Sequence, residues 1–160
     1  MSKSKNNSQN CPKCNNSPWI QRARNFINQN QNVQQGTNKY YQVEAVNYLL
    51  NNGHCGIDCR VRINNVMEGI NYPKSREDFQ QEVLIPLKKE GIVATLVNPG
   101  PQGGVFIPCN EDEIKEVARQ LFERIESELE NLEGSATGVQ NIEKLANSLK
   151  TIVSRLKNTI

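Results

Sequence analysis

Four cysteines have a spacing that suits a metal ion. Cys11 and Cys14 stand at i and i+3 with a proline between them, and such a turn brings two thiolates to one tetrahedral ion. A closed zinc site needs two further ligands, for which His54, Cys55 and Cys59 are the candidates further along the chain. The sequence therefore predicts a zinc site at Cys11, Cys14, Cys55 and Cys59.

The same residues fit a second interpretation, in which they bind no metal. Cys55 and Cys59 are then free thiols in the core, and Cys11 and Cys14 bind nothing. Cys109, the remaining cysteine, is expected to be a small apolar residue at the edge of the core.

Enzymatic chemistry finds little support in the sequence. The single histidine, His54, is adjacent to Cys55 on a turn, where the two side chains rarely face each other. The glycine-rich stretch 100–104 lacks the following helix that would hold a phosphate. There is no phosphate loop, dinucleotide fingerprint or nucleophile elbow. We predict a protein that is not an enzyme and has no catalytic residues.

Residues 75–90 have the pattern of an amphipathic helix. Apolar residues fall on one side at helical spacing, and Ser75 is a suitable N-cap. Gly91 predicts the end of the helix. Pro86 removes one backbone hydrogen bond, so we expect a bend there or a tight final turn.

Two short apolar strands, 92–97 and 104–107, follow this helix. The turn-rich segment 98–104 between them predicts a β-hairpin. Upstream, residues 40–52 and 60–70 are predicted to form helices, the first ending at Gly53, and Ile57 or Val61 could alternatively open a short strand.

This order of elements resembles the winged helix-turn-helix of many DNA-binding proteins. The resemblance covers residues 40–109 and is carried by VLIPLKKEGIV (83–93), the glycine-rich tip and GVFIP (104–108). It implies a mainly α fold with a small β-hairpin, double-stranded DNA as the partner, and a third helix that enters the major groove.

In that arrangement the start of the third helix would meet base edges, two arginines would hold phosphates, and the hairpin tip would meet the backbone or the minor groove. The predicted DNA-binding residues are Lys74, Ser75, Arg76, Gln80, Gln81, Arg60, Arg62, Asn98 and Gln102. Residues 71–90 nevertheless hold four basic and four acidic side chains, so a protein partner is an alternative.

The two ends of the chain differ in charge. Residues 1–39 hold six basic residues and no acid, are rich in Asn and Gln, and are predicted to form a flexible basic arm with a short helix between Trp19 and Ile27. Residues 111–133 hold nine acids against three bases.

Residues 110–160 are predicted to form two helices separated by 134–138. Asn110 is a suitable cap for the first, with Glu113 completing a capping box. Both helices carry apolar stripes, which either pack on the chain's own domain or pair two chains, and we predict a homodimer. The predicted dimerisation residues are Leu121, Phe122, Ile125, Leu129, Leu149, Ile152 and Leu156.

These patterns predict a cytoplasmic, dimeric, sequence-specific transcriptional regulator. No apolar run approaches the roughly 20 residues that a membrane helix needs, and the first ten residues are polar. One alternative is a protein-interaction or DNA-targeting adaptor subunit of a defence, transposition or replication assembly. Another is a zinc- or thiol-responsive switch, in which ligation at Cys55 and Cys59 changes DNA affinity.

Overall fold

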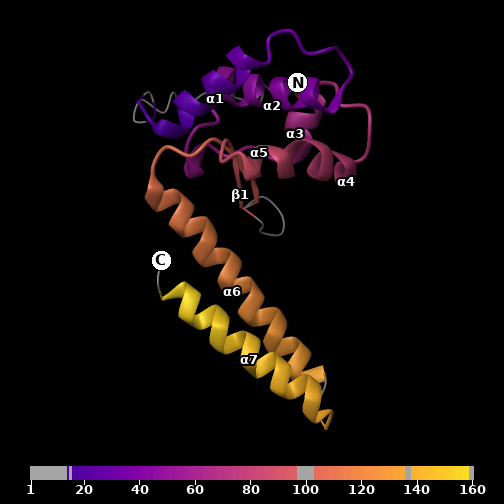
Figure 1. The fold of residues 1–160 in the computed structure, drawn as a ribbon, viewed down its shortest axis with the longest axis vertical. Coiled ribbons are helices and arrows are strands. Elements are labelled where there is room, and N and C mark those ends of the chain that lie inside the picture. Colours follow the sequence, from indigo (N-terminus) through magenta and orange to yellow (C-terminus); the bar gives the residue numbers. More distant parts are fainter. Residues whose placement is uncertain (1–13, 15, 97–102, 136–137, 159–160) are drawn as a thin grey trace, which may run out of the picture. The chain divides into compact units, whose positions relative to one another are not determined.

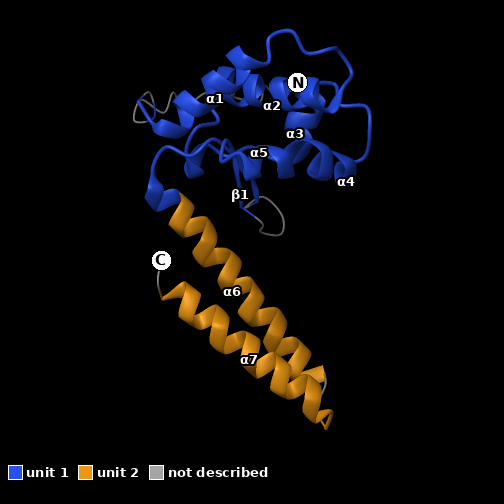
Figure 2. Ribbon diagram, in the orientation of Figure 1, with its two compact units in different colours: residues 1–113 blue, residues 114–160 orange. Residues whose placement is uncertain are grey.

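The computed structural model describes Cys14 and residues 16–96, 103–135 and 138–158, and the chain divides into two compact units, residues 1–113 and 114–160 (Figures 1 and 2). The elements in chain order are α1 (Pro18–Gln29), α2 (Asn38–Asn51), the 3-10 turn η2 (Ile57–Cys59), α3 (Ile63–Gly69), α4 (Arg76–Phe79), η3 (Gln80–Leu84), α5 (Ile85–Lys89), β1 (Ala94–Leu96), β2 (Gly104–Phe106), α6 (Glu111–Ser135) and α7 (Gln140–Lys157). The predicted fold class, mainly α with a small β-hairpin and two C-terminal helices, is confirmed.

Three helices of the first unit end in the same way. The residue after the C-cap of α2, α3 and α5 is left-handed: Gly53 (φ 70°), Asn71 (φ 51°) and Gly91 (φ 64°). The next N–H then reaches back to a carbonyl of the last turn, as from Ile92 to Leu87 at 3.0 Å. The predicted stops at Gly53 and Gly91 are confirmed, and Asn71 is a third, since asparagine tolerates this conformation better than most residues.

The helix that contains Pro86 has a wide π-helical turn before the proline, and not the tight final turn that was one of the two expectations. The run α4–η3–α5 is continuous, and its middle part, η3, is a π-helical turn in which Ile85 N–H bonds to Gln80 O. In a regular helix the N–H of residue 86 would bond to the carbonyl of Glu82, and proline has no N–H. The buried side chain of Gln42, on α2, donates to that carbonyl through Nε2 at 2.8 Å. The carbonyl thus keeps a partner, and α2 is fixed against the helix that contains the proline.

Strands β1 and β2 pair antiparallel, with Ala94 opposite Phe106, which confirms the predicted hairpin. The alternative of a short strand at Ile57 or Val61 is met only in part, because Ile57 lies in the turn η2 and Val61 forms an isolated bridge with Val105. In this bridge the two residues exchange both backbone hydrogen bonds, at 3.0 and 2.8 Å. This close pairing requires Gly104, where a Cβ would lie 2.6 Å from the carbonyl oxygen of Val61.

Helix α1 differs from the predicted flexible arm. Its residues Ile20, Ala23 and Phe26 are buried and belong to the same core as α2, α3 and α5. Arg22 Nη1 donates to the carbonyl of Gly91 at 3.0 Å, at the end of α5. The prediction is corrected for this helix, because its apolar residues are buried by a surface that lies far away in the sequence. Residues 1–13 lie outside the described residues.

The second unit is a hairpin of α6 and α7 (Figure 1). Its residues Leu129, Ala146 and Val153 are buried. Lys157, on α7, pairs with Glu126 at 3.2 Å and with Glu123 at 3.4 Å, both on α6. These pairs are partly exposed and each adds little stability.

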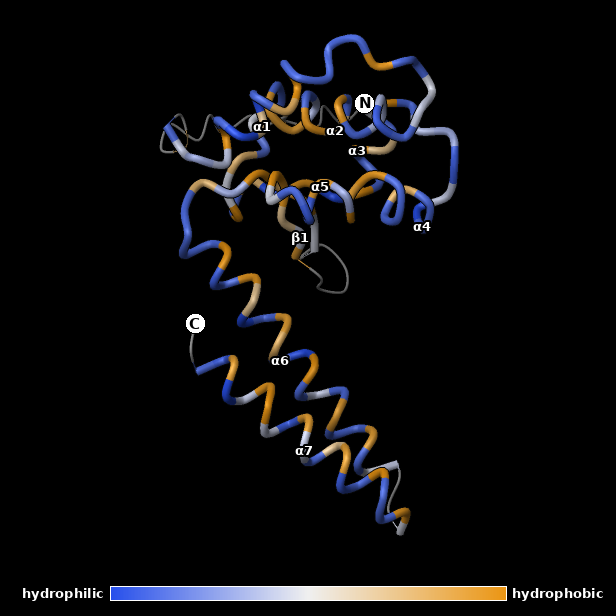
Figure 3. The backbone as a smooth tube through the Cα atoms, in the orientation of Figure 1, coloured by the Kyte–Doolittle hydropathy of each residue, from blue (hydrophilic) through white to orange (hydrophobic). Residues whose placement is uncertain are grey.

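Hydrophobic residues recur along both hairpin helices (Figure 3), and several large apolar side chains of these helices are exposed. Among them, Leu145 is 58% and Ile152 53% exposed. Of the predicted dimerisation residues, those that are at least 39% exposed are Leu121, Leu149, Ile152 and Leu156. Phe122 and Ile125 are half-buried, and Leu129 is buried in its own chain. No helix in the described ranges is long and apolar enough to cross a membrane.

The replacement Gln42→Leu tests how the proline is accommodated. It removes the donor to the Glu82 carbonyl and should lower the free energy of unfolding by about 1–3 kcal/mol, measured by urea denaturation. In a Pro86→Ala background the new N–H can bond to this carbonyl, so the same replacement should cost clearly less. Equal costs in the two backgrounds would contradict this account of the buried glutamine.

Candidate nucleic-acid interface

The helical run α4–η3–α5 has one buried and one exposed face. Phe79 and Leu87 are fully buried in the core, while Arg76, Gln80 and Gln81 are exposed. The predicted base-contacting residues Arg76, Gln80 and Gln81 therefore lie together on the outer face of one helical run. A helix that packs by one face and presents arginine and glutamine on the other can donate and accept hydrogen bonds in a groove.

The start of α4 is held by a capping box. The Oγ of Ser75 accepts the N–H of Asp78 at 3.1 Å, and the Asp78 carboxylate accepts the N–H of Ser75 at 3.3 Å and its hydroxyl at 2.8 Å. The predicted N-cap is confirmed. The side chain of Ser75 is engaged in the cap and holds the first turn of α4, which carries Arg76.

Lys74 is paired within the chain. Its ammonium donates to both carboxylate oxygens of Glu82 at 2.8 Å, and the hydroxyl of Tyr72 donates to the same carboxylate at 2.8 Å. The hydrogen bonds from Lys74 and Tyr72 lower the pKa of Glu82, and the bond to Glu82 raises the pKa of Lys74. Burial, followed by the hydrogen bond to Glu82, raises the pKa of Tyr72. Of the predicted DNA-binding residues, Lys74 thus has its charge neutralised by Glu82.

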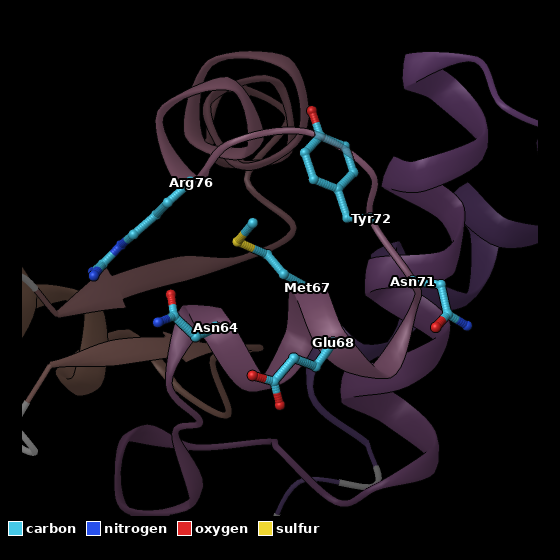
Figure 4. A pocket seen from close by; sticks show the side chains of 6 residues that line it. All are labelled: Asn64, Met67, Glu68, Asn71, Tyr72 and Arg76. Carbon is cyan, nitrogen blue, oxygen red and sulfur yellow. The ribbon is translucent and has the colours of Figure 1, made fainter.

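A surface pocket of about 620 Å³ lies where α3 turns into α4 (Figure 4). It is lined by Asn64, Met67, Glu68, Asn71, Tyr72 and Arg76. Arg76 extends from the start of α4 along the side of the pocket where Asn64 lies. Its lining includes one basic residue, Arg76, and one acidic residue, Glu68, so their formal charges cancel.

The four remaining predicted DNA-binding residues have different environments. Arg60 is half-buried, and its Nη1 donates to the carbonyl of Ile57 at 2.8 Å. Arg62 is exposed directly before α3. Asn98 and Gln102, at the hairpin tip, lie outside the described residues.

Lys88 is a further cation of this region that is not among the predicted site residues. It is exposed on α5, and its ammonium donates to the hydroxyl of Thr95 on β1 at 3.4 Å, which places a positive charge between the helix and the hairpin. The signal was available, because Lys88 follows Gln81 by seven residues, or about two helical turns.

The cysteines are not grouped as predicted. Cys14 forms a disulfide with Cys109, 95 residues away in the sequence, so Cys109 is not merely an apolar edge residue. Cys59 is also disulfide-bonded, and Cys55 is a free, buried thiol whose pKa is raised by burial. Cys11 lies outside the described residues. Among those that are described, no set of three or more His, Cys, Asp or Glu side chains has the arrangement of a metal site.

Glu113 does not have the role in a capping box that the sequence predicts. Its N–H bonds to Asn110 Oδ1 at 3.1 Å, as in the predicted cap, but its carboxylate does not complete a capping box. The two carboxylate oxygens accept the N–H of Cys109 at 2.8 Å and the N–H of Ile57 at 3.1 Å. Glu113 therefore joins the end of the hairpin to the turn η2.

Replacing Glu82 by Gln tests the network around Lys74. Because the pKa of Glu82 is lowered in the folded chain, the stabilisation by its carboxylate is present above its ordinary pKa of 4.5 and is lost as the pH falls through the folded value. The wild type should therefore unfold at a higher urea concentration than Glu82→Gln at pH 7, and the difference should shrink below about pH 4.5. The exposed Glu68→Gln serves as the control; a difference that does not shrink as the pH falls below 4.5 would contradict the assignment.

Comparison with known proteins gives one informative match. No protein-family model matches the chain, and no solved structure matches it. The chain is 78% identical over 160 residues, the whole of both chains, to a protein of Methanocaldococcus jannaschii named "Putative control protein C.MjaVP". At this identity and full coverage, the chain belongs to the family of that control protein.

Proposed function

We propose that the chain is a transcriptional regulator that binds duplex DNA, with the outer face of α4–η3–α5 in the major groove. The observation that carries the proposal is that Arg76, Gln80 and Gln81 are exposed together on a helix that follows α3 through a short turn and precedes a β-hairpin. This order of elements is that of a winged helix-turn-helix. The relative's name, a control protein, supports a regulatory role.

The chemistry of this face suits base recognition. An arginine can donate two hydrogen bonds to guanine, and a glutamine can pair with adenine, so Arg76 and Gln80 would carry sequence preference. The capping box at Ser75 and the buried Phe79 hold the helix rigidly, so these side chains are presented by a fixed backbone.

Phosphate contacts would come from exposed cations around this face. Arg62 stands before α3, and Lys88 and Lys89 stand in the last turn of α5. Lys74 would contribute less, since Glu82 already neutralises it. The acidic residues of the same helical run keep the total charge low, so we expect binding that depends on base contacts more than on a broad positive field.

We infer further that two chains pair through the C-terminal hairpin. Seven large apolar residues of α6 and α7 are at least 39% exposed, namely Leu121, Leu132, Ile142, Leu145, Leu149, Ile152 and Leu156. Two such hairpins can form a four-helix bundle that buries these residues. A symmetric dimer would offer two recognition helices to an inverted repeat.

A second candidate function is recruitment of another protein, as in an adaptor subunit. The observation that favours it is the equal number of acidic and basic residues, four of each, in 71–90. Salt dependence separates the two candidates, because DNA affinity falls steeply as salt rises, whereas an apolar protein interface is much less sensitive.

Arg76→Ala tests the recognition helix. Binding of the full chain to a duplex selected from random sequences, measured by fluorescence anisotropy, should weaken roughly five-fold to a hundred-fold, since one bidentate contact contributes about 1–3 kcal/mol. Gln80→Ala should weaken binding and relax the preference at one position. The exposed Arg155→Ala, on α7, is the matched control and should bind like the wild type. Unchanged affinity in Arg76→Ala, or failure of the wild type to select any duplex, would exclude this use of the helix.

The double replacement of Leu145 and Ile152 by Glu tests the pairing of hairpins. The wild type should have the mass of a dimer by light scattering, twice 18.1 kDa, because the exposed apolar faces cover each other. The double variant should be a monomer of unchanged helical content. Asn147→Glu, on the same helix, should remain dimeric. A wild type that is monomeric at all concentrations would rule out the bundle.

A further inference from the structure

The exposed face of α1 carries no acidic residue. Residues 16–43, which contain α1 and the first part of α2, hold three basic residues and no Asp or Glu. Apart from the proline at its start, the exposed residues of α1 are two arginines and four amides, namely Gln21, Arg22, Arg24, Asn25, Asn28 and Gln29. All of these side chains can donate hydrogen bonds. This face therefore differs from residues 71–90, where acids and bases are equal in number.

The two arginines lie at opposite edges of this face. Successive residues of a helix are turned by about 100°, so Arg22 and Arg24 are roughly 160° apart around the axis of α1. Asn25 and Gln29 follow Arg22 by three and seven residues and lie on its side of the helix. We call Arg22, Asn25 and Gln29 the α1 row.

The α1 row meets the end of α5. Arg22 Nη1 donates to the carbonyl of Gly91 at 3.0 Å, and a Cβ built on Gly91 would lie 2.5 Å from the same nitrogen. The glycine thus lets the guanidinium reach the backbone that follows α5. Nearby, Lys39 Nζ lies 4.3 Å from the centre of the Phe26 ring and 3.5 Å from Oε1 of Glu90. These contacts join α1 and the start of α2 to the end of the helical run that carries Arg76.

The contact with Gly91 leaves Arg22 able to bind an anion. A guanidinium has five N–H donors, and a carbonyl oxygen is neutral, so this contact orients the group without cancelling its charge. Arg22 is exposed, as is Lys89, which stands two residues before Gly91. The charge of Lys39 is opposed by Glu90, so Arg22 and Lys89 are the stronger candidates for an anionic ligand.

We propose that the α1 row and Lys89 bind the sugar–phosphate backbone of one DNA strand, beside the end of the helix that enters the major groove. This contact presupposes the DNA binding proposed above and would supply phosphate affinity that α4–η3–α5 lacks. Arginine, lysine, asparagine and glutamine all bind phosphate oxygens, whatever the base sequence. A face without acids suits a polyanion, while the side chains around Arg76 would select the bases.

Arg24 offers a matched control on the same helix. Burial raises the pKa of the Cys55 thiol, and the nearby positive charge of Arg24 acts against this by lowering it. Arg24 is therefore close to the segment that follows α2, whereas Arg22 contacts the end of α5. The two residues have the same charge and are both exposed, so they differ mainly in the edge of α1 on which they lie.

The test compares Arg22→Gln with Arg24→Gln in the full chain. Glutamine at position 22 keeps an N–H donor for the Gly91 carbonyl but carries no charge. Fluorescence anisotropy with the duplex that the wild type selects gives Kd from about 50 to 200 mM salt. The slope of log Kd against log salt should fall by about 0.9 in Arg22→Gln, because one phosphate contact is lost. Arg24→Gln should keep the wild-type slope.

An added charge covers the case in which Arg22→Gln loosens α1. Gln29→Lys extends the α1 row by one cation and should steepen the slope by about 0.9. Asn28→Lys lies toward the edge of Arg24 and should leave the slope unchanged.

Equal losses of slope in Arg22→Gln and Arg24→Gln would indicate a general field and not a contact, and would overturn the proposal. An unchanged slope in both Arg22→Gln and Gln29→Lys would overturn it as well. In either case, binding that still depends on Arg76 would leave the proposed DNA recognition in place. A wild type that binds no duplex would overturn both proposals.

Discussion

Pro86 lies inside the helical run α4–η3–α5, and the need to keep the carbonyl of Glu82 paired links this run to the packing of the first unit. Pro86 cannot donate to the carbonyl of Glu82, and the helix responds with a wide turn over Gln80–Leu84. Gln42 reaches across from α2 to donate to that carbonyl. One hydrogen bond therefore couples the packing of α2 to the helix that presents Arg76 and Gln80, and a helix held in this way is suited to rigid recognition.

The β-hairpin is hydrogen-bonded to other segments of the first unit. On one side, Val61 exchanges both backbone bonds with Val105, and Gly104 lets the two backbones approach. Beyond β2, the N–H of Ile107 bonds to the carbonyl of His54, so the segment that follows α2 runs beside the end of the hairpin. Short strands of three residues are weak alone, and these additional pairings explain how a two-stranded ribbon stays ordered at its base.

In the second unit, few of the apolar residues are buried and many are exposed. Its hairpin buries Leu129, Ala146 and Val153, while larger apolar residues of both helices stay exposed. Ion pairs such as Lys157 with Glu126 select the antiparallel pairing of the two helices but add little stability at the surface. Exposing these apolar side chains to water is unfavourable in free energy. Pairing with a second copy of the chain would bury them against the same apolar faces of that copy.

The sequence by itself determined the features that depend on neighbours along the chain. The helix stops at Gly53 and Gly91, the cap at Ser75, the hairpin and the exposed face of Arg76, Gln80 and Gln81 all follow from local conformational preference and periodicity. Only the tertiary structure decided that α1 belongs to the core, that Glu82 engages Lys74 and that Cys14 meets Cys109 rather than Cys55. These contacts join residues whose separation along the chain leaves no periodic signal, so they are fixed by how the elements pack and not by the residues beside them.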